Sequence, residues 1–251
     1  MDTRPIGVFD SGLGGLTALR ELARRMPQED LVYFGDTGRV PYGSRSKETI
    51  IKYAQQDVAF LSTFDPKAIV IACGTVSTTA LDTLRQQYAV PLYGVVEPAA
   101  RAAAHRTKNG KVGLIGTQVT ARACPLFVPL VENGRFHPGD IVVETVVKEY
   151  LEEVKAQEVD TLMLGCTHYP LLREVIGACM GPEVELVDVG AECARWVMGQ
   201  LSGRDQLAPQ DRKGSHRYFV SDSTGDFAAL ASMFLGEDVT GDVEQIDITV
   251  Y

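Results

Sequence analysis

Two stretches of this sequence decide its fold: Ala68-Ile-Val-Ile-Ala-Cys-Gly-Thr75 and Thr161-Leu-Met-Leu-Gly-Cys-Thr-His168. Each is a short apolar run that ends in a cysteine and leads into a helical stretch. Strands that alternate with helices in this way predict a parallel sheet with helices on both faces. Cys73 and Cys166 are 93 positions apart, about one small domain. The repeat therefore predicts two similar parallel-sheet α/β domains that face each other across a cleft, each contributing one cysteine.

The rest of the chain alternates in the same manner. Apolar runs predict strands over residues 6–9, 31–35, 68–72, 92–96, 111–115, 161–164 and 184–189. Amphipathic periodicity predicts helices over residues 16–26, 47–63, 78–87, 145–157 and 170–179. We expect residues 1–95 and 190–251 to form the first domain and residues 96–189 the second. The polar stretch 202–215 is typical of a surface loop.

Composition excludes several classes of protein. Of the 251 residues, 45% are hydrophobic and 23% are charged, as in ordinary globular chains. The net charge of −9 argues against nucleic-acid and membrane partners, which require a basic surface. No apolar run approaches the roughly 18 residues of a membrane span, and the N-terminus lacks a signal-peptide pattern, so we expect a cytoplasmic protein. Five cysteines without a C-x-x-C pair do not indicate a disulfide framework or a zinc site.

The two strand-end cysteines suggest thiol chemistry. A thiol at the start of a helix is expected to have a lowered pKa, because the helix end favours the thiolate. Disulfide exchange usually employs cysteines that are close in sequence, and nucleophilic catalysis requires one thiol and a base. Racemisation with two bases requires two thiols: one removes a proton from a stereocentre and the other returns a proton to the opposite face.

Each thiol requires a group that manages its proton. Asp10 ends the first strand, where its carboxyl group could hydrogen-bond Cys73 or simply cap the following helix. His168 lies two residues after Cys166 and could serve that thiol or bond to the backbone.

Neutral polar side chains also follow the expected strands closely. They are Ser11, Thr75, Thr117 and Thr167. The glycine-rich turn 10–15 does not complete a phosphate-loop pattern, but its N–H groups could hold a carboxylate at the start of a helix. The loop 35–44, which includes Tyr42 and Gly43, could form a lid or clamp over the cleft.

Together these residues resemble the glutamate racemases of the cofactor-independent aspartate/glutamate racemase superfamily. The resemblance extends through most of the chain, and its last segment is highly specific. The matching segments are Phe9-Asp-Ser-Gly-Leu-Gly-Gly15, residues 35–44, Ala72-Cys-Gly-Thr75, Val96-Glu-Pro98, Ile115-Gly-Thr117, Cys124-Pro-Leu-Phe-Val-Pro-Leu-Val-Glu132 and Gly165-Cys-Thr-His-Tyr-Pro-Leu-Leu172.

The resemblance implies conversion of L-glutamate to D-glutamate for peptidoglycan, without pyridoxal phosphate or a metal. It implies that Cys73 and Cys166 are the acid/base thiols and that Asp10, His168 and Glu132 assist them. It also implies that the protein can form a homodimer. The substrate-binding positions that it implies are Ser11, Tyr42, Gly43, Gly74, Thr75, Thr117 and Thr167.

Two departures from the family pattern leave alternatives open. Gly74 stands where the family has Asn, and losing such a hydrogen bond to a charged group costs roughly 1.5–3 kcal/mol. Only residues 118–123 separate Thr117 from Cys124, so the second domain is expected to be shorter by about one helix and one strand. The chain could therefore be a racemase or epimerase for a different small acid, or a weakened paralogue with a binding role.

Overall fold

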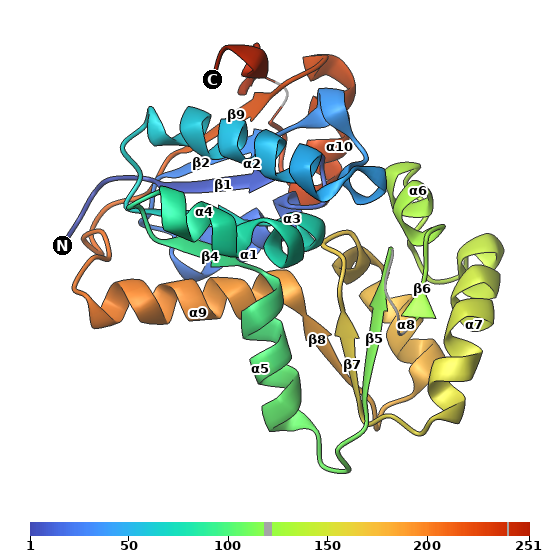
Figure 1. Cartoon of the computed structure of the whole chain (residues 1–251). Coiled ribbons are helices and arrows are strands. Elements are labelled where there is room, and N and C mark those ends of the chain that lie inside the picture. The colour runs from blue at the N-terminus through green and yellow to red at the C-terminus, as the bar shows by residue number, and fades with distance from the viewer. Residues whose placement is uncertain (118–121, 240) are drawn as a thin grey trace.

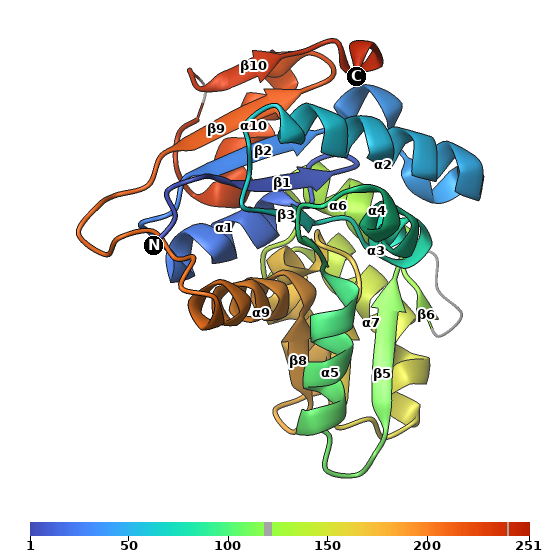
Figure 2. The same cartoon turned by 60° about the vertical axis from the view of Figure 1, so that its left-hand side comes forward.

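The first sheet has six strands in the order β10-β9-β2-β1-β3-β4 (Figures 1 and 2). Their bounds are Ile6–Asp10 (β1), Leu31–Gly35 (β2), Ala68–Ile71 (β3), Leu92–Gly94 (β4), His216–Val220 (β9) and Val243–Gln245 (β10). In the computed structural model, which describes residues 1–117, 122–239 and 241–251, all pairings in this sheet are parallel. β1 and β2 are buried along their whole length, as expected of strands covered by helices on both faces.

Two groups of helices cover the first sheet. The helices α1 (Leu16–Arg25), α9 (Val189–Gly203) and α10 (Thr224–Leu235) pack on one face with the side chains of Ile6 and Val8. The other face, which carries Phe9, is covered by α2 (Lys47–Ser62), α3 (Gly74–Thr79) and α4 (Leu81–Gln87). The alternation of side chains along β1 therefore supplies both halves of the core.

The second sheet has four parallel strands in the order β6-β5-β7-β8. Their bounds are Val112–Gly116 (β5), Arg122–Ala123 (β6), Thr161–Leu164 (β7) and Glu185–Asp188 (β8). The helices α7 (Ile141–Ala156) and α8 (Arg173–Met180) pack together on one face, and α5 (Val96–Arg106) covers β7 and β8 on the other. The arrowheads of β5 and β7 point toward the first sheet (Figure 1). One apolar core joins the two sheets through α1, α5 and α9.

The predicted α/β class with two parallel sheets is confirmed. The second sheet includes the short strand β6, which has two residues and pairs with the end of β5. Five residues lie between these two strands, whereas a parallel crossover usually requires about a dozen. β6 lies at the edge of the second sheet.

Several boundaries differ from the predictions. The helix expected over 78–87 is two helices, α3 and α4, which are divided at Ala80. The helix α7 begins earlier than expected because the Asp140 side chain accepts hydrogen bonds from the N–H groups of Val142 and Val143 and caps it. The C-terminal part of the chain supplies β9, which pairs with β2 and so contributes to the first sheet. The domain boundaries themselves stay a prediction. Within the described ranges, no helix is both long enough and apolar enough to cross a membrane.

Candidate active site

A cavity of about 870 Å³ lies where the carboxyl ends of both sheets meet. Parallel α/β sheets bind ligands at this end of their strands. All twelve residues singled out from the sequence line this one cavity, although they come from both halves of the chain. They are Asp10, Ser11, Tyr42, Gly43, Cys73, Gly74, Thr75, Thr117, Glu132, Cys166, Thr167 and His168.

Cys73 lies between β3 and α3 and is buried. Its Sγ atom is 3.3 Å from the hydroxyl oxygen of Ser11. Burial raises the pKa of the Cys73 thiol to about 12, and the nearby Asp10 carboxylate adds to the increase. The prediction of a lowered pKa for this thiol is therefore wrong. Hydrogen bonds from Ser11 and from the N–H group of Val76 lower the pKa of Cys73, but burial raises it by more. At neutral pH Cys73 is a protonated thiol that can donate a proton.

Asp10 organises the turn between β1 and α1. Its Oδ2 atom accepts hydrogen bonds from the N–H groups of Gly12 and Gly15, each 3.1 Å long. Burial raises the pKa of Asp10, although His168 and these N–H groups act in the opposite direction. The Cys73 thiol is hydrogen-bonded to Ser11 rather than to Asp10. Asp10 therefore acts on Cys73 through its charge and through the turn that carries Ser11.

Cys166, His168 and Glu132 form a chain of polar contacts on the other side of the cavity. The Nδ1 atom of His168 is 3.7 Å from the Sγ atom of Cys166, and its Nε2 atom is 3.0 Å from Oε1 of Glu132. Glu132 ends the helix α6 (Phe127–Glu132), which follows the shortened crossover. Burial lowers the pKa of His168, but hydrogen bonds to Cys166 and Glu132 raise it by more, to about 10. The His168 imidazole is therefore close enough to Cys166 to exchange a proton with it.

Glycine residues allow the loops of the two halves to approach each other. A Cβ atom on Gly14 would lie 2.4 Å from Nδ1 of His168 and 2.5 Å from Oγ1 of Thr167. A Cβ atom on Gly74 would lie 3.0 Å from the carbonyl oxygen of Gly165. The turn after β1 and the loop after β3 therefore both contact the loop that carries Cys166.

The predicted lid over residues 35–44 is tied to the protein through the Tyr42 side chain. It contains two short turns, η1 (Thr37–Arg39) and η2 (Tyr42–Ser44). The Tyr42 hydroxyl contacts the buried carboxyl groups of Asp36 and Asp57. This hydroxyl is thus already hydrogen-bonded inside the protein, and what Tyr42 offers a ligand is its ring and its main chain.

Sequence reasoning did not identify two cations at the cavity. Arg45 and Lys47 are exposed and line it, directly after the loop 35–44. The signal was the alternation Ser44-Arg-Ser-Lys47, which is unremarkable by itself in a chain with 24 basic residues. In an acidic protein, two cations at the cavity favour an anionic ligand.

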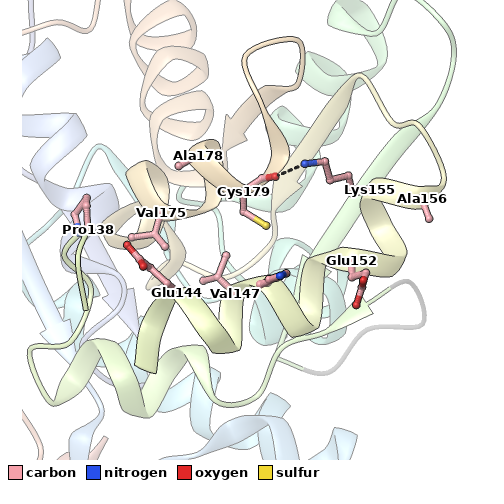
Figure 3. A pocket seen from close by; sticks show the side chains of 10 residues that line it. Pro138, Glu144, Val147, Glu152, Lys155, Ala156, Val175, Ala178 and Cys179 are labelled. Carbon is pink, nitrogen blue, oxygen red and sulfur yellow. Dashed lines mark hydrogen bonds between the residues drawn. The ribbon is translucent and has the colours of Figure 1, made fainter. Parts of the chain in front are cut away.

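A second cavity, of about 630 Å³, lies between α7 and α8 (Figure 3). Val147, Val175 and Ala178 supply its apolar wall, and Glu144 and Glu152 lie along α7. The Nζ atom of Lys155 donates a hydrogen bond of 2.8 Å to the main-chain oxygen of Cys179. None of the twelve residues singled out from the sequence lines this cavity.

A family model for the Asp/Glu/hydantoin racemases matches residues 9–133, which include Cys73. The glutamate racemase of Geobacter metallireducens is 45% identical over 99% of this chain and 98% of its own length. The crystal structure of glutamate racemase from Thermus thermophilus, in complex with β-chloro-D-alanine, is 42% identical and superimposes with a TM-score of 0.90 over all of both chains. Glutamate racemase from Francisella tularensis, in complex with D-glutamate, is 33% identical with a TM-score of 0.88, also over all of both chains.

The chain belongs to the glutamate racemase family, whose members are isomerases. The alignment with the Geobacter protein runs over 268 positions, 17 more than the 251 residues of this chain. That relative therefore has residues without a counterpart in this chain.

Proposed function

We propose that this protein interconverts L- and D-glutamate by proton transfer between Cα of the substrate and the two thiols Cys73 and Cys166, without a cofactor. The observation that carries the proposal is that both cysteines, with a different set of polar partners each, line one cavity at the strand ends. The relatives named glutamate racemase support the substrate.

The two thiols suit opposite roles at the start of the reaction, one as the base and the other as the acid. Cys166 beside the His168 imidazole can act as the thiolate that removes the Cα proton, and it becomes a thiol. Cys73, held protonated by burial, can donate its proton to the other face of the planar carbanion and become a thiolate. Conversion in the reverse direction exchanges these roles, and exchange with water after product release restores both groups.

The neutral hydroxyl groups and the main chain around the thiols suit the substrate carboxylates. We assign Ser11, Thr75, Thr117 and Thr167 as hydrogen-bond donors, with main-chain contacts from Gly43 and Gly74. The charged side chains of Asp10, His168 and Glu132 control the protonation of the two thiols. Arg45 and Lys47 attract the acidic substrate to the cavity.

The test is enantiomer conversion followed by chiral chromatography, with purified protein and no added cofactor. L-Glutamate and D-glutamate should each yield the other, and Cys73→Ala and Cys166→Ala should each reduce the rate by at least about 10³-fold. Cys179→Ala, in the second cavity, is the matched control and should keep full activity. Folded protein that converts neither enantiomer contradicts the proposal, and conversion of aspartate instead of glutamate assigns another substrate.

We further infer that the product, D-glutamate, serves peptidoglycan synthesis in the cytoplasm.

We also assign the two sheets to two domains, residues 1–95 with 190–251 and residues 96–189. The protein is a homodimer in solution. Light scattering on the eluted protein tests the dimer, and a monomer mass at micromolar concentration would contradict it.

A further inference from the structure

A buried polar cluster lies behind the loop that forms one wall of the cavity. Its centre consists of Asp36, Arg39, Tyr42 and Asp57, which come from the loop after β2 and from α2. The side chains of Asp36 and Asp57 are 0% exposed, and Tyr42 is 1% exposed. Val40, Pro41, Tyr42 and Gly43, in the same loop, line the candidate active site. The cluster is thus in a position to fix this wall.

The hydrogen-bond donors in the cluster are divided unequally between the two carboxyl groups. Asp36 accepts from Nε of Arg39 at 2.5 Å, from the Ser221 hydroxyl at 2.7 Å and from the Tyr42 hydroxyl. On Asp57, the Oδ1 atom accepts from Nη2 of Arg39 at 3.0 Å. The other oxygen of Asp57, Oδ2, lies 3.1 Å from the hydroxyl oxygen of Tyr42. Asp36 therefore has the donors that a buried carboxylate requires, and Asp57 has fewer.

Counting protons separates the two acids further. A tyrosine hydroxyl has one proton, and here the closer of its two carboxyl contacts is to Asp36. If Asp57 were ionised, its Oδ2 atom would face the Tyr42 oxygen without a proton between them. If Asp57 is protonated, its carboxyl proton makes that hydrogen bond. The cluster then holds one positive and one negative charge, which is the cheaper arrangement in a buried site.

We propose that Asp57 is a positioning residue that acts as a protonated carboxylic acid, donating a hydrogen bond to the Tyr42 oxygen and so holding residues 40–43 against the active site. The groups that face it are Asp36, Arg39 and Tyr42 at the loop, Asp10 on β1 and Tyr88 after α4. Burial, together with the Asp36 carboxylate, raises the pKa of Asp57 well above its ordinary value, in agreement with this assignment. The kinetic part of the proposal rests on the proposed racemase function.

The kinetic test compares two substitutions of the same residue. In Asp57→Asn the carboxamide can donate to Tyr42 and accept from Arg39, so kcat and KM should stay within about threefold of the wild-type values. In Asp57→Ala both contacts are lost, and KM for glutamate should rise by roughly tenfold with a smaller change in kcat. Asp82→Asn, on the exposed side of α4, is the control for loss of a carboxylate. An Asn variant as impaired as the Ala variant, or an Ala variant with unchanged KM, overturns the proposal.

An infrared difference spectrum tests the protonation without any turnover. Wild-type protein minus Asp57→Asn, at neutral pH, should contain the carbonyl band of a protonated carboxylic acid, and this band should shift in D₂O. A spectrum in which only carboxylate bands are lost overturns the protonated Asp57. Since this measurement does not depend on glutamate, failure of the racemase proposal and failure of the Asp57 proposal can be told apart.

Discussion

The hydroxyl group of Thr17, in α1, donates a hydrogen bond of 2.6 Å to the main-chain carbonyl of Thr167, which follows Cys166. The same hydroxyl lies 3.0 Å from the carbonyl oxygen of Gly14. Thr17 and Thr167 are both buried. One side chain thus connects the helix after β1 to the loop that carries the second thiol, and with it the two halves of the site.

Replacing Thr17 by Val keeps the shape of the side chain and removes this connection. The Thr167 carbonyl then lacks its buried donor, which should cost about 1–3 kcal/mol of unfolding free energy. Urea unfolding measures the loss, and kcat should fall as well. Thr145→Val is the control, because Thr145 makes a similar bond to Ile141 on the exposed face of α7. Equal stability of the Thr17→Val variant and the wild type would contradict the structural role.

Gly14→Ala should disable the site while the fold persists. The new methyl group would lie within 2.5 Å of both His168 and Thr167, so the loop that carries Cys166 must move. Since a shift of about 1 Å in an active site can cost 10²-fold in rate, we expect at least that loss in kcat. Gly199→Ala, where nothing lies within 4 Å of the added methyl group, is the control. Wild-type kcat in Gly14→Ala would show that this close approach is not required.

The pKa of His168 predicts how stability depends on pH. Burial lowers this pKa, but Cys166 and Glu132 raise it to about 10, above the ordinary value of 6.5. The resulting stabilisation is complete below about pH 6.5 and is lost as the pH rises through about 10. Urea unfolding of wild type and Glu132→Gln should therefore differ most near pH 6.5 and least above pH 10. A difference that stays constant over this range would show that Glu132 does not stabilise a charged imidazole.

Arg45 and Lys47 should affect capture of the substrate more than its conversion. We expect the double variant Arg45→Ala/Lys47→Ala to lower kcat/KM several-fold at low salt, with kcat almost unchanged. The deficit should shrink as ionic strength rises, because exposed charges are screened over about 10 Å at 0.1 M salt. Lys52→Ala, an exposed cation elsewhere on α2, is the control. A deficit that does not depend on salt would point to direct contact instead of attraction at a distance.

The central strands could be predicted because their sequences leave few alternatives. The run that begins at Ala68 is buried on both faces, and the observed β3 lies within the predicted range. The strands β9 and β10 were not predicted, because β9 begins with His216 and Arg217 and β10 ends with two exposed polar residues. Their strand conformation follows from pairing with β2 and with each other, which is a property of the folded chain.

The gathering of the site residues could be predicted because parallel strands bring their carboxyl ends together. The contact between His168 and Cys166 was among the predicted alternatives, whereas the partner of Cys73 and the protonation states could not be predicted. Cys73 bonds to Ser11 and has a raised pKa because the surrounding chain buries it, and local sequence does not specify burial. Asp57 lies in the middle of α2, and its contact with Tyr42 arises only when that helix packs behind the loop.

The most direct test of the two-thiol account is the fate of the Cα proton during the first few per cent of turnover in D₂O, followed by NMR. With two bases on opposite faces, the product should carry deuterium at Cα from either enantiomer, while the remaining substrate keeps its proton. Product that retains the substrate's own proton would contradict the account, since one group would then both remove and return it.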